Sequence, residues 1–447
     1  MLNYLSHGLG STNYLIASFI IFPLIIALGI YLSVILGPIQ ITLFKEGFLH
    51  LLGKKKRGCK KHISSFEALL TVLAGNLGTG NISGMAVALA TGGPGALPWM
   101  WVMAFLGAII KYSGCVLGLK YREKKEDGSY VGGPMYYLDK GLGWKKMAIV
   151  FSISSLFCAL TVGNLVQVNS ISLPATQMGI PKLYFGLLVA ILVGMVILGG
   201  ARRIIRVITM IVPFMTLVYL GCCLFILWQH ADQVLPSIKT ILISSINFKA
   251  ASGGFFGFGI MKVISIGFER GVFATDAGLG IAPVLQSGIK TENKIIEGVV
   301  AMMAPLVVMV ICSLTFLVLM VSQAHACGEE STNMCVWAFK TSFNSTFAGH
   351  IVTLSLFFFA FTTIIAWYTC SEKVLYYLFK DKYLRRFKFL FILIVPLGAL
   401  MQSEFVWLLA DFFISIMLIT NVLAVIGLSS EIIADSKEYL GISEESS

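Results

Sequence analysis

The chain has 447 residues, of which 57% are hydrophobic and only 12% are charged. A soluble domain carries about 25% charged residues, so this composition predicts a protein whose main solvent is lipid. The net charge of +11 does not indicate nucleic-acid binding, because the basic residues lie in short loops between apolar runs and form no single polar face.

Eleven apolar segments are long enough to be membrane helices, which need about 20 residues each. The first segment has no Lys or Arg before it and is longer than a signal-peptide core, so we expect it to be retained. Together the eleven predict one all-α integral membrane domain over 1–447. The segments are 14–37, 64–91, 96–119, 146–171, 183–200, 204–228, 253–285, 293–322, 348–371, 387–402 and 405–430.

The basic residues alternate between the two sides of these segments. Loops on one side contain 26 Lys and Arg residues, loops on the other side contain four, and three lie inside segments. Lys and Arg gather on the cytoplasmic side of short loops. We therefore expect a multi-pass protein of the bacterial or archaeal cell (inner) membrane, with the N-terminus outside and a cytoplasmic tail at 431–447.

Two cysteines share one polar loop that faces outward on this topology. Cys327 and Cys335 could form a disulfide in an oxidising compartment, or they could be two unrelated thiols, and the sequence leaves both readings open.

The segment 64–91 contains a poor helix at its centre. It opens with an S-x-x-E capping pattern from Ser64 to Glu67 and then runs through GNLGTGN at 75–81. Each glycine costs about 1 kcal/mol in a helix relative to alanine. We expect this stretch to unwind around a polar site, because Asn76, Thr79 and Asn81 accompany the glycines and freed backbone groups need a cavity or protein cover. The alternative is a close-packing glycine face.

The segment 253–285 has a similar interruption, GVFATDAGLG at 271–280. It lies five segments after 64–91 and should cross in the opposite direction. This is typical of a five-plus-five inverted repeat, here 64–228 and 253–430 with 14–37 as an extra helix, in which broken helices surround the substrate. Unwound N–H donors suit an anion and unwound carbonyls suit a cation, so the centre suits an amino acid.

Two charged side chains lie inside the second broken segment. Arg270 and Asp276 are costly at membrane depth and are therefore functional candidates. A structural pair between them, or with Lys262, is the alternative.

Six short motifs carry a family resemblance that runs through almost the whole chain. With them the sequence resembles the alanine/glycine:cation symporters, also called sodium:alanine symporters, which have the LeuT-type inverted-repeat fold. The motifs are GTGNI at 78–82, GGPGA at 92–96, WMW at 99–101, YVGGPMYYL at 130–138, GNLVQVN at 163–169 and FTTIIAW at 361–367.

The resemblance implies a substrate site between the two interruptions. The substrate carboxylate would meet backbone N–H groups from Gly78 through Thr79 to Gly80 and the side chain of Gln167. Its ammonium would meet carbonyls and polar groups near Ala274 and Thr275. Trp367 and Thr363 would be walls that limit side-chain size. Taken alone, Gln167 could instead join two helices and Trp367 could be packing.

The resemblance also implies a sodium site made of oxygen ligands, which hard cations prefer. The hydroxyls of Thr362 and Thr363 would act with carbonyls near Ala74 and Leu77, and Asn81 could serve a second ion. The alternative for both threonines is a hydrogen bond back to their own helix.

The chain departs from the family at the second interruption. Where the family typically carries Ser-Asn-Glu-Ala-Gly, this sequence reads ATDAG at 274–278, and Ile281 follows where a serine is common. A hydroxyl and an amide have been exchanged, so the resemblance does not fix the preferred substrate or the ion stoichiometry.

The expected function is that of a secondary symporter for a small neutral amino acid, coupled to Na⁺ or H⁺, with no organic cofactor. No G-x-x-x-x-G-K-[ST] motif appears, which argues against an ATP-driven pump. A membrane enzyme is disfavoured because all six histidines lie in loops, tails or helix ends. A passive channel and the same fold carrying another solute remain alternatives, and a monomer in the lipid bilayer is the simplest assembly.

Overall fold

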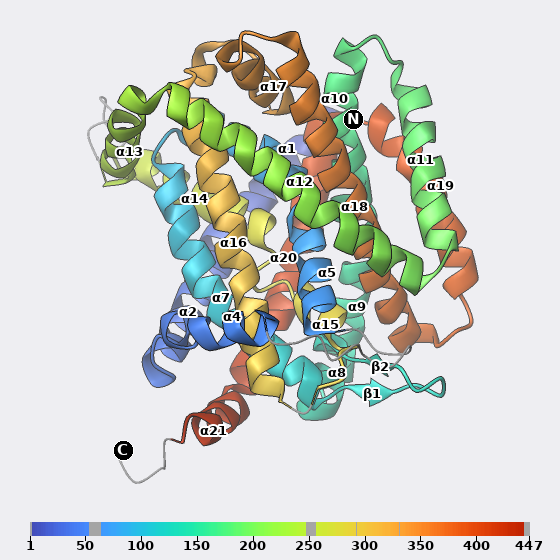
Figure 1. The fold of residues 1–447 in the computed structure, drawn as a ribbon. Helices are drawn as coiled ribbons and strands as arrows, with labels where there is room; N and C mark the ends of the chain where they lie inside the picture. The colour runs from blue at the N-terminus through green and yellow to red at the C-terminus, as the bar shows by residue number, and fades with distance from the viewer. Residues whose placement is uncertain (1, 53–63, 247–255, 292, 330, 442–447) are drawn as a thin grey trace.

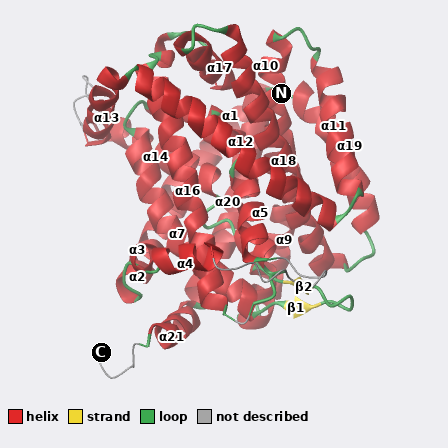
Figure 2. Cartoon of the chain, viewed as in Figure 1, coloured by secondary structure: helices red, strands yellow, loops and turns green. Residues whose placement is uncertain are grey.

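The computed structural model describes residues 2–52, 64–246, 256–291, 293–329 and 331–441. Nearly all of this chain is helical, and the one sheet in the described part is a short hairpin (Figure 2). In the hairpin, β1 (Glu123–Lys124) pairs antiparallel with β2 (Tyr130–Val131).

Seven helices in the described part are long and apolar enough to cross a membrane. They are Gly8–Ile35, built from α1 (Leu2–Ile16), the π-helical turn η1 (Ala17–Ile21) and α2 (Phe22–Ile35); α7 (Ala96–Lys120); Lys145–Gln177, built from α9 (Lys145–Leu160), the π-helical turn η4 (Thr161–Leu165) and α10 (Val166–Gln177); α12 (Ala201–Gln229); α16 (Lys294–Val321); Ala348–Phe379 of α18 (Thr346–Phe379); and α20 (Ser403–Gly427).

The other four predicted segments are also helical where the structure describes them. Two of them form the 17-residue helices α11 (Lys182–Leu198) and α19 (Leu384–Leu400), which pack side by side at one flank of the bundle (Figure 1). The remaining two are interrupted. The start of the segment 253–285 lies outside the described residues, and eleven membrane crossings remain a prediction. The interrupted segments are α5 (Ser65–Asn76), η2 (Thr79–Asn81) and α6 (Ser83–Gly92), and α14 (Phe256–Thr275) with α15 (Ile281–Gln286).

Helix α7 is the central element of the bundle and packs along α16, α14, α2 and α15. Small residues permit the close approach. A β-carbon added at Gly107 would lie 2.5 Å from the β-carbon of Ala277, and one added at Gly118 would lie 2.8 Å from Pro283. These glycines therefore bring α7 directly against the second interrupted helix.

Several short helices occupy regions that the sequence predicted as loops or tail. Each has too few apolar residues to register in a 20-residue hydrophobic window. The helix α21 lies partly in the predicted tail, at the end of the bundle opposite α17 (Figure 1). They are α3 (Ile39–Thr42), α4 (Phe44–Leu52), α8 (Pro134–Tyr136), η3 (Tyr137–Gly141), α13 (Ala231–Ile246), η6 (Ala324–Ala326), α17 (Ser331–Ser342) and α21 (Ser429–Leu440).

The disulfide considered between Cys327 and Cys335 is not formed. Both are free thiols, and the Cys335 thiol on α17 instead donates to the Ile82 carbonyl at 3.3 Å. The two cysteines share a loop in sequence, but folding of α17 turns one of them into the bundle.

Helix α21 is bound to the ends of two long helices by carboxylates. Lys120 at the end of α7 contacts Glu431 at 2.7 Å and Asp435 at 3.0 Å. Lys294 at the start of α16 contacts the same Asp435 at 2.8 Å. The hydroxyl of Tyr121 also donates to Glu431 at 2.8 Å. The last described helix therefore joins α7 to α16.

Acid should weaken the attachment of α21. Burial raises the pKa of Asp435, but hydrogen bonds from Lys294 and Lys120 outweigh burial and hold this pKa below its ordinary value. A depressed folded-state pKa gives stability at neutral pH that is lost as the pH falls through that pKa. We expect the melting temperature of the detergent-purified protein to decrease once the pH is lowered below about 4, which is near the ordinary pKa of an Asp carboxyl.

Two variants isolate this contribution. Asp435→Asn should melt at a lower temperature at pH 7 and should show a weaker acid dependence than the parent. The exposed Glu438, on the same helix, provides the control Glu438→Gln. Equal acid dependence in Asp435→Asn and the parent protein would show that this carboxylate does not hold α21.

Candidate functional site

Both interruptions predicted from the sequence are present as breaks between helices. Helix α5 ends at Asn76 and α6 begins at Ser83, while α14 ends at Thr275 and α15 begins at Ile281. The predicted capping box is also present, since the Ser64 hydroxyl accepts from the backbone of Glu67 and the Glu67 carboxylate accepts from the backbone of Ser64.

The first break is an extended turn followed by a single 3₁₀ turn. Gly78 is extended, with φ −97° and ψ −164°, and Thr79 begins the 3₁₀ turn. A β-carbon at Gly78 would lie 2.8 Å from Gln167 Oε1 and 3.1 Å from Thr363 Oγ1. Glycine at this position therefore allows two polar side chains from other helices to approach the unwound backbone.

Gln167 on α10 binds the unwound backbone directly. Its Oε1 accepts from the backbone N–H of Thr79 at 3.0 Å and from the Thr79 hydroxyl at 3.2 Å, and its Nε2 donates to the Val162 carbonyl at 3.0 Å. Gln167 thus joins helices, as the alternative reading held. It also binds the Thr79 N–H group, which the resemblance assigned to the substrate carboxylate. The helix-joining role and the expected substrate contact therefore fall at the same position.

The second break contains three left-handed residues. Asp276 has φ 49°, and Gly278 and Gly280 each have φ 84°. Glycine adopts this conformation without steric cost, and Asp is among the few other residues that tolerate it. The side-chain amide of Asn421 donates to the Gly278 carbonyl at 2.7 Å, and the hydroxyl of Tyr137 donates to Asn421 Oδ1.

The two breaks touch each other. The side-chain amide of Asn76 donates to the backbone carbonyl of Thr275 at 2.9 Å, and the side chain of Asn81 donates to the Asn76 carbonyl at 2.6 Å. Lys111 on α7 donates to the same Thr275 carbonyl at 2.8 Å. A carbonyl oxygen has two lone pairs, so the Thr275 carbonyl is fully engaged.

The two threonines assigned to an ion behave differently. The Thr363 hydroxyl donates across helices to the Ala74 carbonyl at 2.8 Å. The Thr362 hydroxyl donates to Phe358 at 2.9 Å and Phe359 at 3.1 Å in its own helix, which is the alternative that the sequence left open. Of this pair, Thr363 is the one that meets an expected carbonyl ligand.

Two large aromatic side chains close the region around the first break. Trp367 is fully buried, and a β-carbon at Gly163 would lie 2.4 Å from its side chain. A β-carbon at Gly80 would lie 2.6 Å from the ring of Phe273, whose centre lies 4.6 Å from the ring centre of Trp407 at an interplanar angle of 37°. Gly163 and Gly80 are thus each covered by an aromatic ring, which packs against the glycine and limits the space beside it.

Arg270 does not pair with Asp276 or Lys262. Its guanidinium is 2.6 Å from Glu269 and 3.9 Å from Asp411, and it lies 5.0 Å from the ring centre of Trp407. The pairing considered from the sequence is therefore wrong. Arg270 lies six positions before Asp276, and the break after Thr275 sends their side chains to different surroundings.

Asp276 instead lies near a lysine that the sequence analysis did not nominate. Lys111, Asp276, Gly278, Gly280 and Asn421 line one small pocket. Within the described chain, Asp276 Oδ2 is a buried atom with no hydrogen-bond partner. Lys111 is one of the three basic residues inside predicted membrane segments, and this unusual position could have marked it as a candidate. No sequence pattern, however, indicated that it lies beside the second break.

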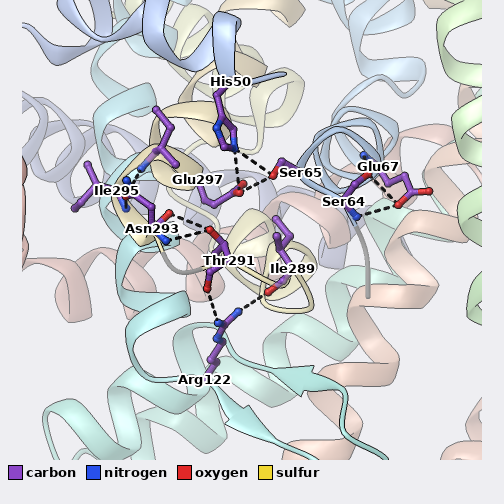
Figure 3. A network of polar contacts seen from close by, with 11 residues as sticks. His50, Ser64, Ser65, Glu67, Arg122, Ile289, Thr291, Asn293, Ile295 and Glu297 are labelled. Carbon is purple, nitrogen blue, oxygen red and sulfur yellow. Dashed lines mark hydrogen bonds and ion pairs between the residues drawn. The ribbon is translucent and has the colours of Figure 1, made fainter. Parts of the chain in front are cut away.

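A second polar network lies at the end of the bundle that carries α4 and the hairpin (Figure 3). The Ser65 hydroxyl at the start of α5 donates to Glu297 on α16 at 2.5 Å, and His50 on α4 lies 3.5 Å from the same carboxylate. Nearby, Arg122 donates to the backbone carbonyls of Ile289 and Thr291 after α15. This network joins the outer ends of both interrupted helices to α7 and α16.

Two interrupted helices in contact inside an apolar helical bundle are typical of the LeuT-like fold of membrane transporters. The comparison of folds agrees. The crystal structure of MhsT in complex with L-phenylalanine superimposes with a TM-score of 0.64, covering 87% of this chain and 94% of MhsT at 12% sequence identity. Likeness at this identity concerns the fold alone.

The chain belongs to the sodium:alanine symporter family, whose model matches residues 2–446. It is 35% identical to the sodium/alanine symporter AgcS of Methanococcus maripaludis and 37% identical to an uncharacterized transporter of Haemophilus influenzae, each match covering 93% of both chains. It is 30% identical to the probable sodium/glutamine symporter GlnT of Bacillus subtilis, over 98% of this chain and 91% of GlnT. The resemblance stated from the motifs is confirmed.

Enlarging Gly163 should disturb the site through Trp367. Gly163→Ala places a methyl group where the indole lies, and overpacking of this kind costs about 1–3 kcal/mol. Gly221→Ala in α12 is the control, because nothing lies within 4 Å of an added β-carbon there. We expect a lower melting temperature and slower uptake for Gly163→Ala only. Equal behaviour of the two variants would contradict tight packing of Trp367 on Gly163.

Proposed function

We propose that this protein is a secondary symporter that imports a small neutral amino acid of the alanine or glycine type together with Na⁺, by alternating access. The observation that carries the proposal is the contact between the breaks, from the Asn76 side chain to the Thr275 carbonyl. Unwound backbone at membrane depth is tolerated where it lines a site or is buried in protein, and LeuT-like transporters bind their substrates there.

We place the chain in the membrane as a five-plus-five inverted repeat. The first repeat is 64–228 and the second is 253–430, with the helix at 14–37 added before them. The contact of α5 with α15 and the opposite positions of α1 and α21 in Figure 1 are compatible with this arrangement. From the distribution of basic residues in the loops, we propose that the N-terminus lies outside and α21 in the cytoplasm.

The substrate carboxylate is proposed to bind at the first break. Thr79, between Gly78 and Gly80, begins the 3₁₀ turn that leads into α6. Its backbone N–H lies on the N-terminal side of this half-helix, where the helix dipole favours an anion. Gln167 Oε1 now accepts from that N–H, so a carboxylate would take its place while the Gln167 amide turns to donate. Trp367 would limit the size of the substrate side chain.

The substrate ammonium is proposed to bind at the second break beside Ala274 and Thr275. Because the Thr275 carbonyl already accepts two hydrogen bonds, we favour the Ala274 carbonyl as the main acceptor. The carbonyl end of α14 carries partial negative charge that suits this cation.

The transported sodium ion is proposed to bind beside the first break. Its ligands would be the carbonyls of Ala74 and Leu77 and the hydroxyls of Thr363 and Thr362. Support comes from the existing contact between the Thr363 hydroxyl and the Ala74 carbonyl. In that geometry a bound ion replaces one hydrogen bond with two oxygen ligands. Asn81 is a candidate ligand for a second ion.

One ion supplies enough energy for useful accumulation. A single charge entering the cell yields about 2.3 kcal/mol per 100 mV, and a tenfold sodium gradient adds about 1.4 kcal/mol. The sum corresponds to roughly 500-fold accumulation of substrate per ion.

A second candidate function is the same transport with H⁺ as the coupling ion or with another small solute as cargo. The departure at 274–276 favours keeping it, because the buried Asp276 carboxylate could accept a proton. Uptake of labelled alanine, glycine and serine into proteoliposomes under imposed Na⁺ or H⁺ gradients decides. Saturable uptake that needs the Na⁺ gradient supports symport, H⁺-driven uptake selects the alternative, and substrate-independent conductance contradicts both.

The two threonines provide a matched pair for the ion site. We expect Thr363→Ala to raise the half-saturating Na⁺ concentration by roughly tenfold, equivalent to about 1.4 kcal/mol of ion binding. Thr362→Ala should have a smaller effect, because that hydroxyl is already bonded within its own helix. The measurement is initial uptake rate against Na⁺ at saturating substrate. Unchanged Na⁺ dependence in both variants would remove this place as the ion site.

A further inference from the structure

Lys111 is a charged side chain inside α7, the most buried of the seven described helices that are long enough to cross a membrane. It lies on α7, is 3% exposed, and donates from Nζ to the Thr275 carbonyl at 2.8 Å. A charged group at membrane depth is expensive and occurs where it has a partner or a task. Its partner here is a backbone carbonyl of the second break.

That carbonyl is a natural place for a cation. Thr275 is the last residue of α14, and the C-terminal end of a helix presents unpaired carbonyls with partial negative charge. The side chain of Asn76 donates to the same oxygen at 2.9 Å, so uncharged and charged donors converge on one acceptor. Lys111 thus lies where a mobile cation would otherwise find oxygen ligands.

A countercharge follows immediately in the chain. Asp276 is 3% exposed, and its Oδ2 has no hydrogen-bond partner among the described residues. Asp276 and Lys111 line the same small pocket, and three glycines, Gly114, Gly278 and Gly280, also line it. A buried carboxylate of this kind is strongly disfavoured without a positive charge close by.

We propose that the Lys111 ammonium is a fixed cation at the break between α14 and α15. It balances Asp276 and occupies the Thr275 carbonyl, so that no second mobile ion binds there beside the substrate ammonium at Ala274. This inference rests on the proposed function and identifies the residue that sets how many ions are transported with each substrate. Because Lys111 is covalently part of α7, its charge stays in the protein while the ion at the first break is carried.

Removing the fixed charge should therefore recruit a mobile one. In Lys111→Met the Asp276 carboxylate loses its balancing charge, and a monovalent cation should enter with each substrate. We expect the number of charges moved per substrate in proteoliposomes, measured from the reversal potential, to rise by about one relative to the parent. Charge movement counts Na⁺ and H⁺ equally, and varying the Na⁺ concentration then tells them apart.

Two companion variants separate charge balance from packing. Lys111→Met/Asp276→Asn removes both charges and should return the charge per substrate to the parent value. Lys111→Arg keeps the charge and should leave the ratio unchanged. The proposal would be overturned if Lys111→Met moved the same number of charges per substrate as the parent protein. It would also be overturned if an increased number persisted in the double variant.

Thermal stability provides a test that does not require transport. If Lys111 balances Asp276, the double variant should melt at a higher temperature than Lys111→Met, because an unpaired buried carboxylate is costly. A purely packing role predicts no rescue by Asp276→Asn, and that result would overturn the proposal. Parent protein that takes up no amino acid with Na⁺ would end the proposed function, while this comparison would still test Lys111.

Discussion

The architecture depends on one hydrogen bond, from the Asn76 side chain on the first interrupted helix to the Thr275 carbonyl on the second. Each break leaves backbone groups that no helix satisfies, and in a membrane such groups must find protein partners. The two breaks partly satisfy each other, while Gln167 serves the N–H side of one and Lys111 serves the carbonyl side of the other. Unwinding at either break alone would leave buried polar groups unpaired, so each break depends on the other.

Close packing around α7 makes this contact possible. At Gly107 and Gly118, α7 lies so close to the second interrupted helix that an added β-carbon would clash with it. Lys111 lies between them on the same helix, so its ammonium reaches the break without crossing lipid. In the proposed mechanism the substrate, the ion and the Lys111 charge would share a small volume and would be coupled by direct contact.

The far ends of the same helices are held by a separate set of polar contacts. Ser65 and Glu297 join the start of α5 to α16, and Lys120 with Asp435 joins α7 to α21 (Figure 3 shows the first of these). Alternating access requires α5 to move relative to its neighbours at one end. These contacts are the ones that such a movement would have to exchange. They lie at helix ends, where Glu297 is buried while Lys120 and Asp435 are partly exposed.

The sequence by itself determined the long helices and both breaks. Apolar length and glycine runs act locally, so a break within 75–81 and another within 271–280 could be predicted before any packing was known. It also determined the family, because the motifs are local strings. Which side chains meet was decided only by the tertiary structure. Arg270 turned to Glu269 and Asp411, Cys335 turned into the bundle, and Lys111 reached Thr275 from more than 160 positions away in the chain. Such pairings depend on helix rotation and on close approach at glycines, and no periodicity within one helix specifies the neighbour that it will face.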